Sequence, residues 1–231
     1  MKNIKKTAAP AGFITWCLAT KASGVNYNYS SLPNPEKGDL HNALTIEQGE
    51  ICGYSMKRIS KTTSHIEHIK PQHECIKYCD EKDLDYNNVL SCYPKPGKGK
   101  CVFGAEQKSS WWNIGLFISP INDSCELKFI YNLKGEINPC GCSIAASQKT
   151  IDVLKLDEPS LTFDRKKAIE EFLYGHDGAS PLSCVDAKRA IDAIYKPNMS
   201  GVLYEYCIAI HDALFEYLDI LKKVVPNPSL C

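Results

Sequence analysis

Residues 64–71 constrain the fold of this chain more than any other stretch. The run from 65 to 69 alternates in a way that suits a short β-strand, and Pro71 ends that strand because proline has no backbone N–H to donate. Neighbouring side chains of a strand point to opposite sides. Glu67 and His68 can therefore share a site only where the strand ends and the next element supplies a facing group. We expect a polar site at this strand end.

The composition is that of an ordinary globular protein. Hydrophobic residues make up 44% of the 231 residues and charged residues 23%. No apolar run reaches the length of a membrane span. The N-terminal residues are basic, but residues 7–10 follow them where a secretory signal would have an apolar core. We therefore expect a cytoplasmic protein without membrane association.

The charge balance excludes a chain that is basic over its whole surface. The 27 Lys and Arg residues equal the 27 Asp and Glu residues. Residues 1–112 nevertheless carry 15 basic and 11 acidic residues, a balance of +4, and the remainder carries 12 and 16, a balance of −4. A mildly positive half around the polar site fits a polyanionic substrate, and an ordinary surface distribution explains it equally well.

The pattern along the rest of the chain predicts an α+β protein. The last third is helical, and its longest helix carries one apolar stripe that is typical of core packing. The stretch that begins at Asp85 is expected to be a loop followed by an irregular or helix-like segment. Helices are expected over residues 11–21, 39–49, 147–154, 163–174, 183–195 and 201–225. Strands are expected over 65–69, 111–118, 126–131 and 136–137, and a strand followed by a turn is expected over 51–61.

Two further segments flank the central strand and complete one pattern. Residues 51–55 contain a partial Cys-x-x-Cys motif that begins at Cys52, and residues 85–92 run through two asparagines to Cys92. With residues 64–72 between them, these segments resemble the HNH endonuclease-like proteins of bacterial anti-phage defence, most closely the PtuB family of Septu and retron systems. The implied fold is a ββα-metal nuclease core. The resemblance covers nearly the whole chain, because it continues through residues 129–131, 135–137, 146, 150–156, 161 and 165.

The resemblance implies a role for each polar residue near the strand end. Glu67 matches the acid that binds a divalent cation such as Mg²⁺, and His68 matches the general base that takes a proton from the attacking water. Asn88 matches the residue that fixes this base through a hydrogen bond to its other ring nitrogen. The cation stabilises the charge that builds on the phosphate.

The last metal ligand of the family follows the fourth cysteine in a Cys-His/Asn/Asp-x-x-Lys arrangement. The corresponding residues 101–108 contain no His or Asp, so Glu106 is the nearest carboxylate that could take this place. His65 is a further candidate ligand, with an ordinary strand residue as the alternative. The expected metal set is therefore Glu67, His65 and Glu106.

Folds of this kind often add a structural zinc ion bound by four thiolates. In this chain Ser55, a poor zinc ligand, stands where one of the four belongs. Other cysteines among the 12 are expected to be small buried hydrophobes in a reducing compartment. The thiols available for zinc are Cys52, Cys92 and Cys101, with Cys75 or Cys79 as a replacement for the missing one.

Basic residues around the expected site are candidate contacts to nucleic-acid phosphates. Several of them lie in the basic insert at residues 94–100, which an ordinary solvated loop explains equally well. The candidates are Lys70, Lys95, Lys98, Lys100 and Lys108.

The expectations divide the chain into a helical N-terminal segment (1–50), a nuclease core (51–112) and a strand-then-helix region (113–231) for support and partner docking. The resemblance implies a metal-dependent nuclease that is the toxic effector of a retron- or Septu-type defence system. Such a nuclease would cleave DNA or RNA, for example tRNA, upon phage infection. The implied partners are a PtuA-type ATPase and the retron reverse transcriptase with its RNA–DNA product.

A role without catalysis is the alternative hypothesis. Ser55 and the missing helix ligand suit a degenerate nuclease fold that bridges the ATPase and nucleic acid. Substitution of Glu67 separates the two hypotheses, because only an enzyme needs its carboxylate.

Overall fold

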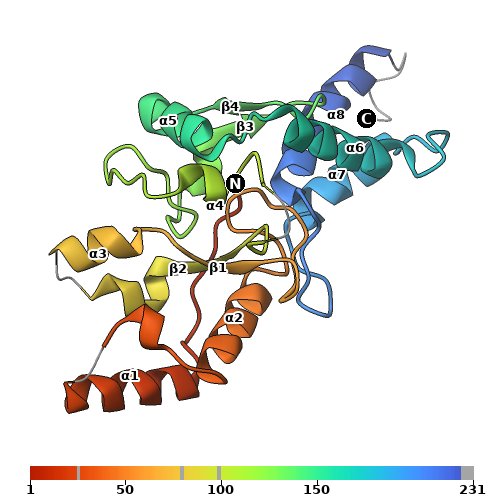
Figure 1. The fold of residues 1–231 in the computed structure, drawn as a ribbon. Coiled ribbons are helices and arrows are strands. Elements are labelled where there is room, and N and C mark those ends of the chain that lie inside the picture. The colour runs from red at the N-terminus through yellow and green to blue at the C-terminus, as the bar shows by residue number, and fades with distance from the viewer. Residues whose placement is uncertain (25–26, 79–80, 98–99, 225–231) are drawn as a thin grey trace.

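The chain forms helices and two small antiparallel sheets, as the α+β pattern predicts. The computed structural model describes residues 1–24, 27–78, 81–97 and 100–224. Figure 1 shows β1, β2 and α1 to α3 in its lower part, and β3, β4 and α5 to α8 in its upper part. The elements are α1 (Ala11–Ser23), α2 (Glu36–Glu47), β1 (His65–His68), α3 (Gln72–Tyr78), β2 (Val89–Cys92), α4 (Ala105–Lys108), β3 (Phe129–Tyr131), β4 (Ile137–Pro139), α5 (Ile144–Leu154), α6 (Pro159–Tyr174), α7 (Cys184–Ala193) and α8 (Cys207–Val224).

The first sheet pairs β1 with β2 in antiparallel register, with His68 opposite Val89. Every residue of β2 is buried. The outer edge of β2 is closed by Gln48, which follows α2. Its amide accepts a hydrogen bond from the N–H of Ser91 at 2.7 Å and donates one to the Ser91 carbonyl at 2.8 Å. The side-chain amide thus satisfies the backbone N–H and C=O of Ser91 at the edge of the sheet. It also fixes the hairpin against α2.

Hydrophobic packing differs on the two faces of β1. Ile66 packs against a small cluster formed by residues of α1, α2 and the segments around them. The larger cluster runs from residue 1 to residue 218 and includes residues from each of the three expected parts of the chain. Because side chains alternate along a strand, Ile66 and His68 leave one face of β1, and His65 and Glu67 leave the other.

The C-terminal region forms a second layer around the hairpin of β3 and β4. Arg165 of α6 is buried there, and its guanidinium donates to the carbonyls of Gly135 and Leu156 at 2.7 Å each. Gly135 has a positive φ of 76°, and a Cβ at this position would lie 2.5 Å from the carbonyl oxygen of Thr162. The turn between β3 and β4 therefore needs glycine in order to approach α6.

The strand expected over residues 111–118 is wrong. This segment is irregular with a turn at residues 114–116, and the rings of Trp111 and Trp112 pack against Phe117 at centre-to-centre distances of 6.2 and 5.8 Å. The aromatic content of this stretch therefore serves packing rather than strand pairing. The turn expected within residues 51–61 is present, and the strand expected there is reduced to one isolated bridge between Ile51 and Arg58.

The helices lie where the sequence predicts them, with shifted ends. α2 begins at Glu36 rather than at residue 39, and α8 begins at Cys207 rather than at residue 201 because turns occupy the residues before it. β2 and α3 were not expected, because four and seven residues are too few to show a clear period. In the described part of the chain, no helix combines the length and the apolar character needed to cross a bilayer.

Candidate active site at the end of β1

His68, the last residue of β1, is held in one orientation. Its Nε2 lies 2.9 Å from the carbonyl oxygen of Asp83 and must donate, because a carbonyl only accepts. In the neutral ring Nδ1 therefore carries the lone pair, and the amide of Gln72 donates to it at 3.3 Å. Tyr29 packs edge-on against the ring, with centres 4.5 Å apart. Burial lowers the pKa of His68, so the ring is a neutral base at neutral pH.

Asn88 immediately precedes β2 and ties together the two segments around His68. Its Oδ1 accepts from the N–H of Lys70 at 2.8 Å, and its Nδ2 donates to the carbonyls of Lys70 at 3.0 Å and Lys82 at 2.8 Å. The hydrogen bond that we expected Asn88 to give His68 is supplied by the carbonyl of Asp83, the neighbour of Lys82. This corrects the expected contact, since Asn88 hydrogen-bonds the loop that carries Asp83 and Asp83 in turn hydrogen-bonds His68.

Glu67 and His65 lie side by side on the other face of β1. Oε2 of Glu67 is 3.8 Å from Nε2 of His65, and Oε1 accepts a hydrogen bond from Nζ of Lys108 at 3.0 Å. Nζ of Lys108 also donates to the backbone carbonyl of His68 at 3.0 Å. The site therefore has two sides. A carboxylate and an imidazole leave one face of the strand, and the candidate base leaves the other, so the three expected catalytic side chains do not converge on one point.

The side chains on the Glu67 face of β1 shift one another's pKa values. Burial raises the pKa of Glu67, but the hydrogen bond with His65 and the charge of Lys108 outweigh burial and lower it. Burial lowers the pKa of His65, but hydrogen bonds to Glu67 and to the carbonyl of Pro94 outweigh burial and raise it. Because Nδ1 of His65 donates to Pro94 at 2.6 Å, Nε2 is the ring atom that faces Oε2 of Glu67, and its proton makes the two side chains an ion pair.

Glu67 and His65 fit as two donors to a divalent cation. Their facing atoms are 3.8 Å apart, a separation that two ligands of one ion can span at about 2.1 Å each. Glu106 does not complete the set as we expected, because its Oε2 accepts from the N–H of Cys101 at 2.8 Å and turns back onto its own loop. Within the described residues, no three His, Cys, Asp or Glu side chains are placed to hold a metal ion.

The thiols expected to bind zinc form a pair rather than a cluster. Burial raises the pKa of Cys52, but hydrogen bonds, the strongest with Cys92, outweigh burial and lower it to about 6. Cys101 lies in the same hydrophobic cluster, yet the described ranges contain no group of three metal ligands. Of the two replacements considered, Cys75 is buried next to the loop after β1, and Cys79 lies outside the described residues. The described residues alone therefore do not form the expected zinc site.

The candidate nucleic-acid lysines differ in exposure. Lys95 and Lys100 are exposed, and Lys70 is half-buried with Nζ 5.2 Å from the ring centre of Tyr78. The side chain of Lys108 is 0% exposed, so it cannot contact a nucleic acid, and this expectation is wrong. Lys98 lies outside the described residues. Two of the five candidates are thus fully available at the surface.

Three contributors to the site were not predicted as such. The carbonyl of Asp83 orients His68, but a backbone group leaves no mark in a sequence. Gln72 lies four residues after His68 in α3, a helix that was itself missed. Lys108 ends the family's Cys-…-Lys pattern, and this position was the one available signal that it pairs with Glu67.

Comparison with known proteins finds one informative similarity. The chain is 35% identical over 146 residues to a protein of Vibrio cholerae serotype O1 biovar El Tor named "Retron Vc95 putative HNH endonuclease". The match covers 58% of this chain and 65% of the relative, so the chain spans less than two thirds of that protein's length. No family model matches the chain. The similarity agrees with the HNH and retron resemblance that the residue pattern indicates.

Proposed function

We propose that this chain is an HNH-type nuclease that hydrolyses phosphodiester bonds in nucleic acid and works in a retron-type defence system. The V. cholerae relative's name supports the class of enzyme and the retron association. The chain order of β1, β2 and α4, with Lys108 of α4 in contact with Glu67 of β1, supports a ββα core. His68 is the last residue of β1 and Asn88 directly precedes β2, and both positions support this proposal.

The orientation of His68 is the observation that carries the proposal. Asp83 occupies Nε2, so the lone pair on Nδ1 is the basic site of the ring. Burial keeps the ring neutral at neutral pH, when a general base must be able to accept a proton. The amide nitrogen of Gln72 lies 3.3 Å from Nδ1. An attacking water that gives its proton to Nδ1 must occupy the position of this nitrogen. Substrate binding therefore has to move the Gln72 side chain aside.

Glu67 and His65 are the residues that we propose to hold the cation. A divalent cation at this pair would stabilise negative charge on the phosphate and on the leaving oxygen. The nitrogen donor of His65 suits Zn²⁺ or Ni²⁺, and the oxygen donor of Glu67 suits Mg²⁺ or Mn²⁺. Because β1 ends at His68, a phosphodiester that lies across the strand end has Glu67 on one side and His68 on the other.

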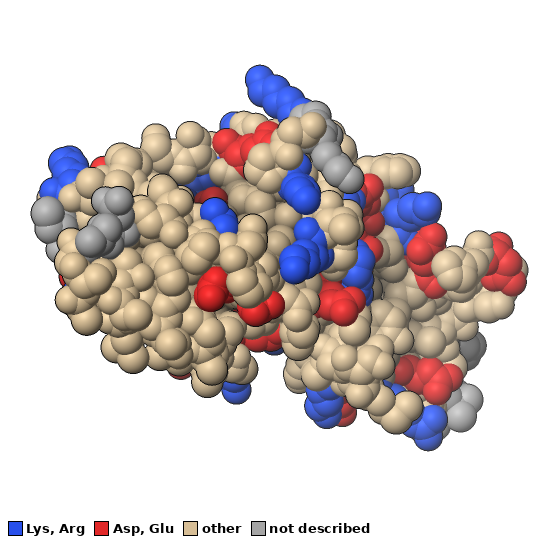
Figure 2. Space-filling model, turned by 60° about the horizontal axis from the view of Figure 1, so that its bottom comes forward, with Lys and Arg blue, Asp and Glu red and all other residues tan. Residues whose placement is uncertain are grey.

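The partners follow from the same proposal. The zero net charge of the chain gives it little general attraction for a polyanion, and Figure 2 shows basic and acidic side chains interspersed on the face turned forward. We therefore propose that a PtuA-type ATPase, together with the retron reverse transcriptase and its RNA–DNA product, brings the nucleic acid to the site in the cytoplasm.

A cleavage assay tests the nuclease proposal. Purified protein, alone and with its ATPase partner, is incubated with plasmid DNA and with tRNA in Mg²⁺, Mn²⁺, Zn²⁺ or EDTA. We expect cleavage that needs a cation and that falls by about 100-fold or more in His68→Ala. The control is His176→Ala, because His176 is exposed in a loop after α6. Circular dichroism checks that both variants are folded. Full activity in His68→Ala would remove the assigned base.

A non-catalytic binding module is the second candidate function, and Lys108 favours it. Its ammonium already neutralises Glu67, so the carboxylate has a structural partner in the absence of any cation. A degenerate core of this kind would bridge the ATPase and nucleic acid. Protection of cells against phage separates the two candidates in Glu67→Gln/Lys108→Met, which leaves no buried charge unpaired. This variant should abolish protection by a nuclease and preserve protection by an adaptor.

A further inference from the structure

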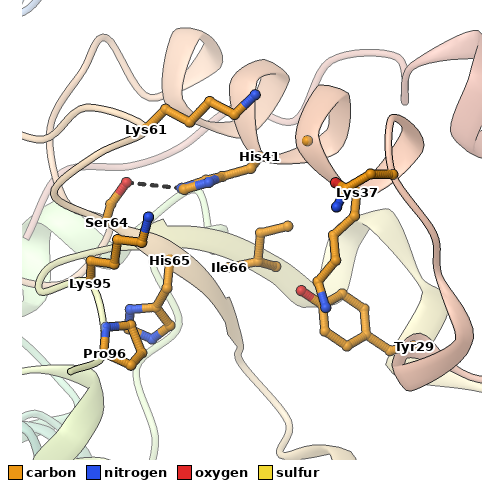
Figure 3. Close-up of a pocket in the computed structure, with 11 residues that line it drawn as sticks. Tyr29, Lys37, His41, Lys61, Ser64, His65, Ile66, Lys95 and Pro96 are labelled. Atoms are coloured by element: carbon orange, nitrogen blue, oxygen red, sulfur yellow. Dashed lines mark hydrogen bonds between the residues drawn. The ribbon is translucent and has the colours of Figure 1, made fainter.

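A pocket of about 490 Å³ opens beside β1, between the start of α2, the turn before β1 and the insert after β2 (Figure 3). Its floor is apolar and includes Ile66 of β1 and the ring of Tyr29. Figure 3 shows Lys37 and Lys61 extending from two sides of the pocket, with Lys95 reaching toward His41. The pocket therefore draws its cations from three segments that are far apart in the sequence.

The lining of the pocket has one sign of charge. Lys37, Lys61 and Lys95 line it together with His41 and His65, and the described lining residues include no carboxylate. In the described part of the chain, none of these three lysines forms an ion pair with Asp or Glu. The grouping differs from the mixed surface around it because the three lysines line one concavity. Three unpaired ammonium groups around one concavity are suited to a multivalent anion.

His41 reports the positive potential of the pocket. The hydroxyl of Ser64 donates to the carbonyl of Ser60 at 2.6 Å, so Nε2 of His41, 2.9 Å from the same hydroxyl, donates to Ser64. The ring is thus fixed at the pocket wall. Burial lowers the pKa of His41, and the nearby positive charges of His65, Lys61 and Lys95 lower it further, to about 4. An anion bound here would relieve this repulsion.

The backbone at the start of α2 makes room for one of the cations. Nζ of Lys61 lies only 3.2 Å from the position that a Cβ on Gly38 would occupy. A Cβ at this position would require the ammonium to shift by a few tenths of an ångström. The absence of a side chain at Gly38 therefore lets Lys61 lie close against α2, where it faces the same space as Lys37.

We propose that this pocket binds a phosphate group of a nucleic-acid backbone next to the strand that carries the candidate active site. His65 lines the pocket and also faces Glu67, so a phosphate held by Lys61 and Lys95 would be adjacent to the proposed cation pair. The pocket would then set the register of the substrate strand, because phosphate contacts position a nucleic acid without reading its sequence. The inference rests on the proposed function for its ligand class.

Oligonucleotide binding without catalysis tests the pocket. A fluorescein-labelled single-stranded oligodeoxynucleotide is titrated with the full chain in EDTA, and anisotropy is followed at several salt concentrations. We expect Lys61→Ala/Lys95→Ala to weaken binding by about tenfold or more, because charge-assisted hydrogen bonds are lost. The slope of log affinity against log salt should fall by about 1.4, or 0.7 for each lost phosphate contact.

A matched variant controls for general charge. Lys188→Ala/Lys196→Ala removes the same two charges from exposed positions in and just after α7. We expect its affinity to stay within about twofold of the unmodified chain, because these contacts would be screened and non-specific. An equal loss of affinity in both double variants would contradict the proposed phosphate site. Unchanged affinity in Lys61→Ala/Lys95→Ala would contradict it as well.

Inorganic phosphate supplies a second readout. We expect phosphate to shift the NMR signals of the His41 ring in the unmodified chain and not in Lys61→Ala/Lys95→Ala. A shift with phosphate but no loss of oligonucleotide affinity in the variant would overturn the backbone assignment in favour of a free-phosphate site. The outcomes also separate the two proposals. If the unmodified chain cleaves nucleic acid and Lys61→Ala/Lys95→Ala binds the oligonucleotide with unchanged affinity, only the pocket proposal is contradicted. If binding depends on the pocket but the unmodified chain does not cleave, only the nuclease proposal is contradicted.

Discussion

The ammonium of Lys108 lies 3.0 Å from Oε1 of Glu67, and none of the lysine side chain is exposed. A buried cation is costly unless it is paired, so each of these side chains depends on the other for its burial. The same ammonium donates to the carbonyl of His68, which lies 40 positions earlier in the chain. α4 therefore anchors the end of β1, and the candidate base and carboxylate are both held by one residue from outside the hairpin.

Lys108→Met should destabilise the fold more than a surface substitution does. The variant leaves the Glu67 carboxylate buried without its partner, which costs about 3 kcal/mol of unfolding free energy. The double variant Glu67→Gln/Lys108→Met should recover most of this loss, because no unpaired charge remains. Urea denaturation measures both, with the exposed Lys188→Ala as a control that changes stability by less than about 0.5 kcal/mol. A double variant no more stable than Lys108→Met would contradict the pairing.

Cleavage should decline in acid as His68 takes up a proton. Burial disfavours the charged ring, so the pKa of His68 in the folded chain lies below the ordinary value of 6.5. Only the neutral ring can act as the base. We therefore expect kcat/KM to be level above pH 6.5 and to fall at lower pH, with a midpoint below 6.5. Initial rates across the acid range at saturating cation measure this, and a midpoint above 6.5 would rule out His68 as the titrating base.

Gln72→Glu should move that midpoint upward. The amide nitrogen of Gln72 lies 3.3 Å from Nδ1 of His68, so a carboxylate at the same place would favour the protonated ring. We expect the midpoint of the acid limb to rise by about one pH unit. Gln72→Met adds no charge and serves as the control, with a midpoint near that of the unmodified chain. Equal midpoints for the two variants would show that residue 72 does not face the base in solution.

The success of sequence-based prediction of this fold depends on the length of each element. The helices α5 to α8 lie in the expected places because each is long enough to show a period. β2 spans four residues, and its strand character comes from its pairing with β1 and from the Gln48 amide on its edge. Both are tertiary contacts, so no local pattern indicated the strand. The strand expected at residues 111–118 is wrong although its local pattern favours a strand. Its aromatic rings pack against one another across a turn, and the segment pairs with no strand in the described part of the chain.

The candidate site, like the fold, was predictable from the sequence only in part. The two-residue period of a strand places His65 and Glu67 on one face, and this much was readable from the sequence. The orientation of His68 was not, because it depends on where the loop after α3 brings the carbonyl of Asp83. Glu106 was expected beside Glu67 because it is the nearest carboxylate to the position of the family's last metal ligand. The left-handed Gly104 before α4, at φ 77°, starts a helix in which Glu106 turns back to Cys101 instead.

Asn88→Ala should disturb His68 although the two side chains are not hydrogen-bonded to each other in the described structure. The substitution removes the hydrogen bonds from the Asn88 side chain to the backbone of Lys70 and Lys82, which costs about 3 kcal/mol of unfolding free energy. The loop that carries Asp83 is then released. Because its carbonyl favours the charged ring, loss of this hydrogen bond should lower the pKa of His68 still further.

NMR titration of the His68 ring measures this change directly. Asn87→Ala is the matched control, since the Asn87 side chain is exposed and contacts only the nearby Asp85 among the described residues. We expect this variant to keep both the pKa of His68 and nearly all of the stability. A purely structural role for Asn88 predicts lower stability with an unchanged pKa, whereas a positioning role requires the stability and the pKa to fall together.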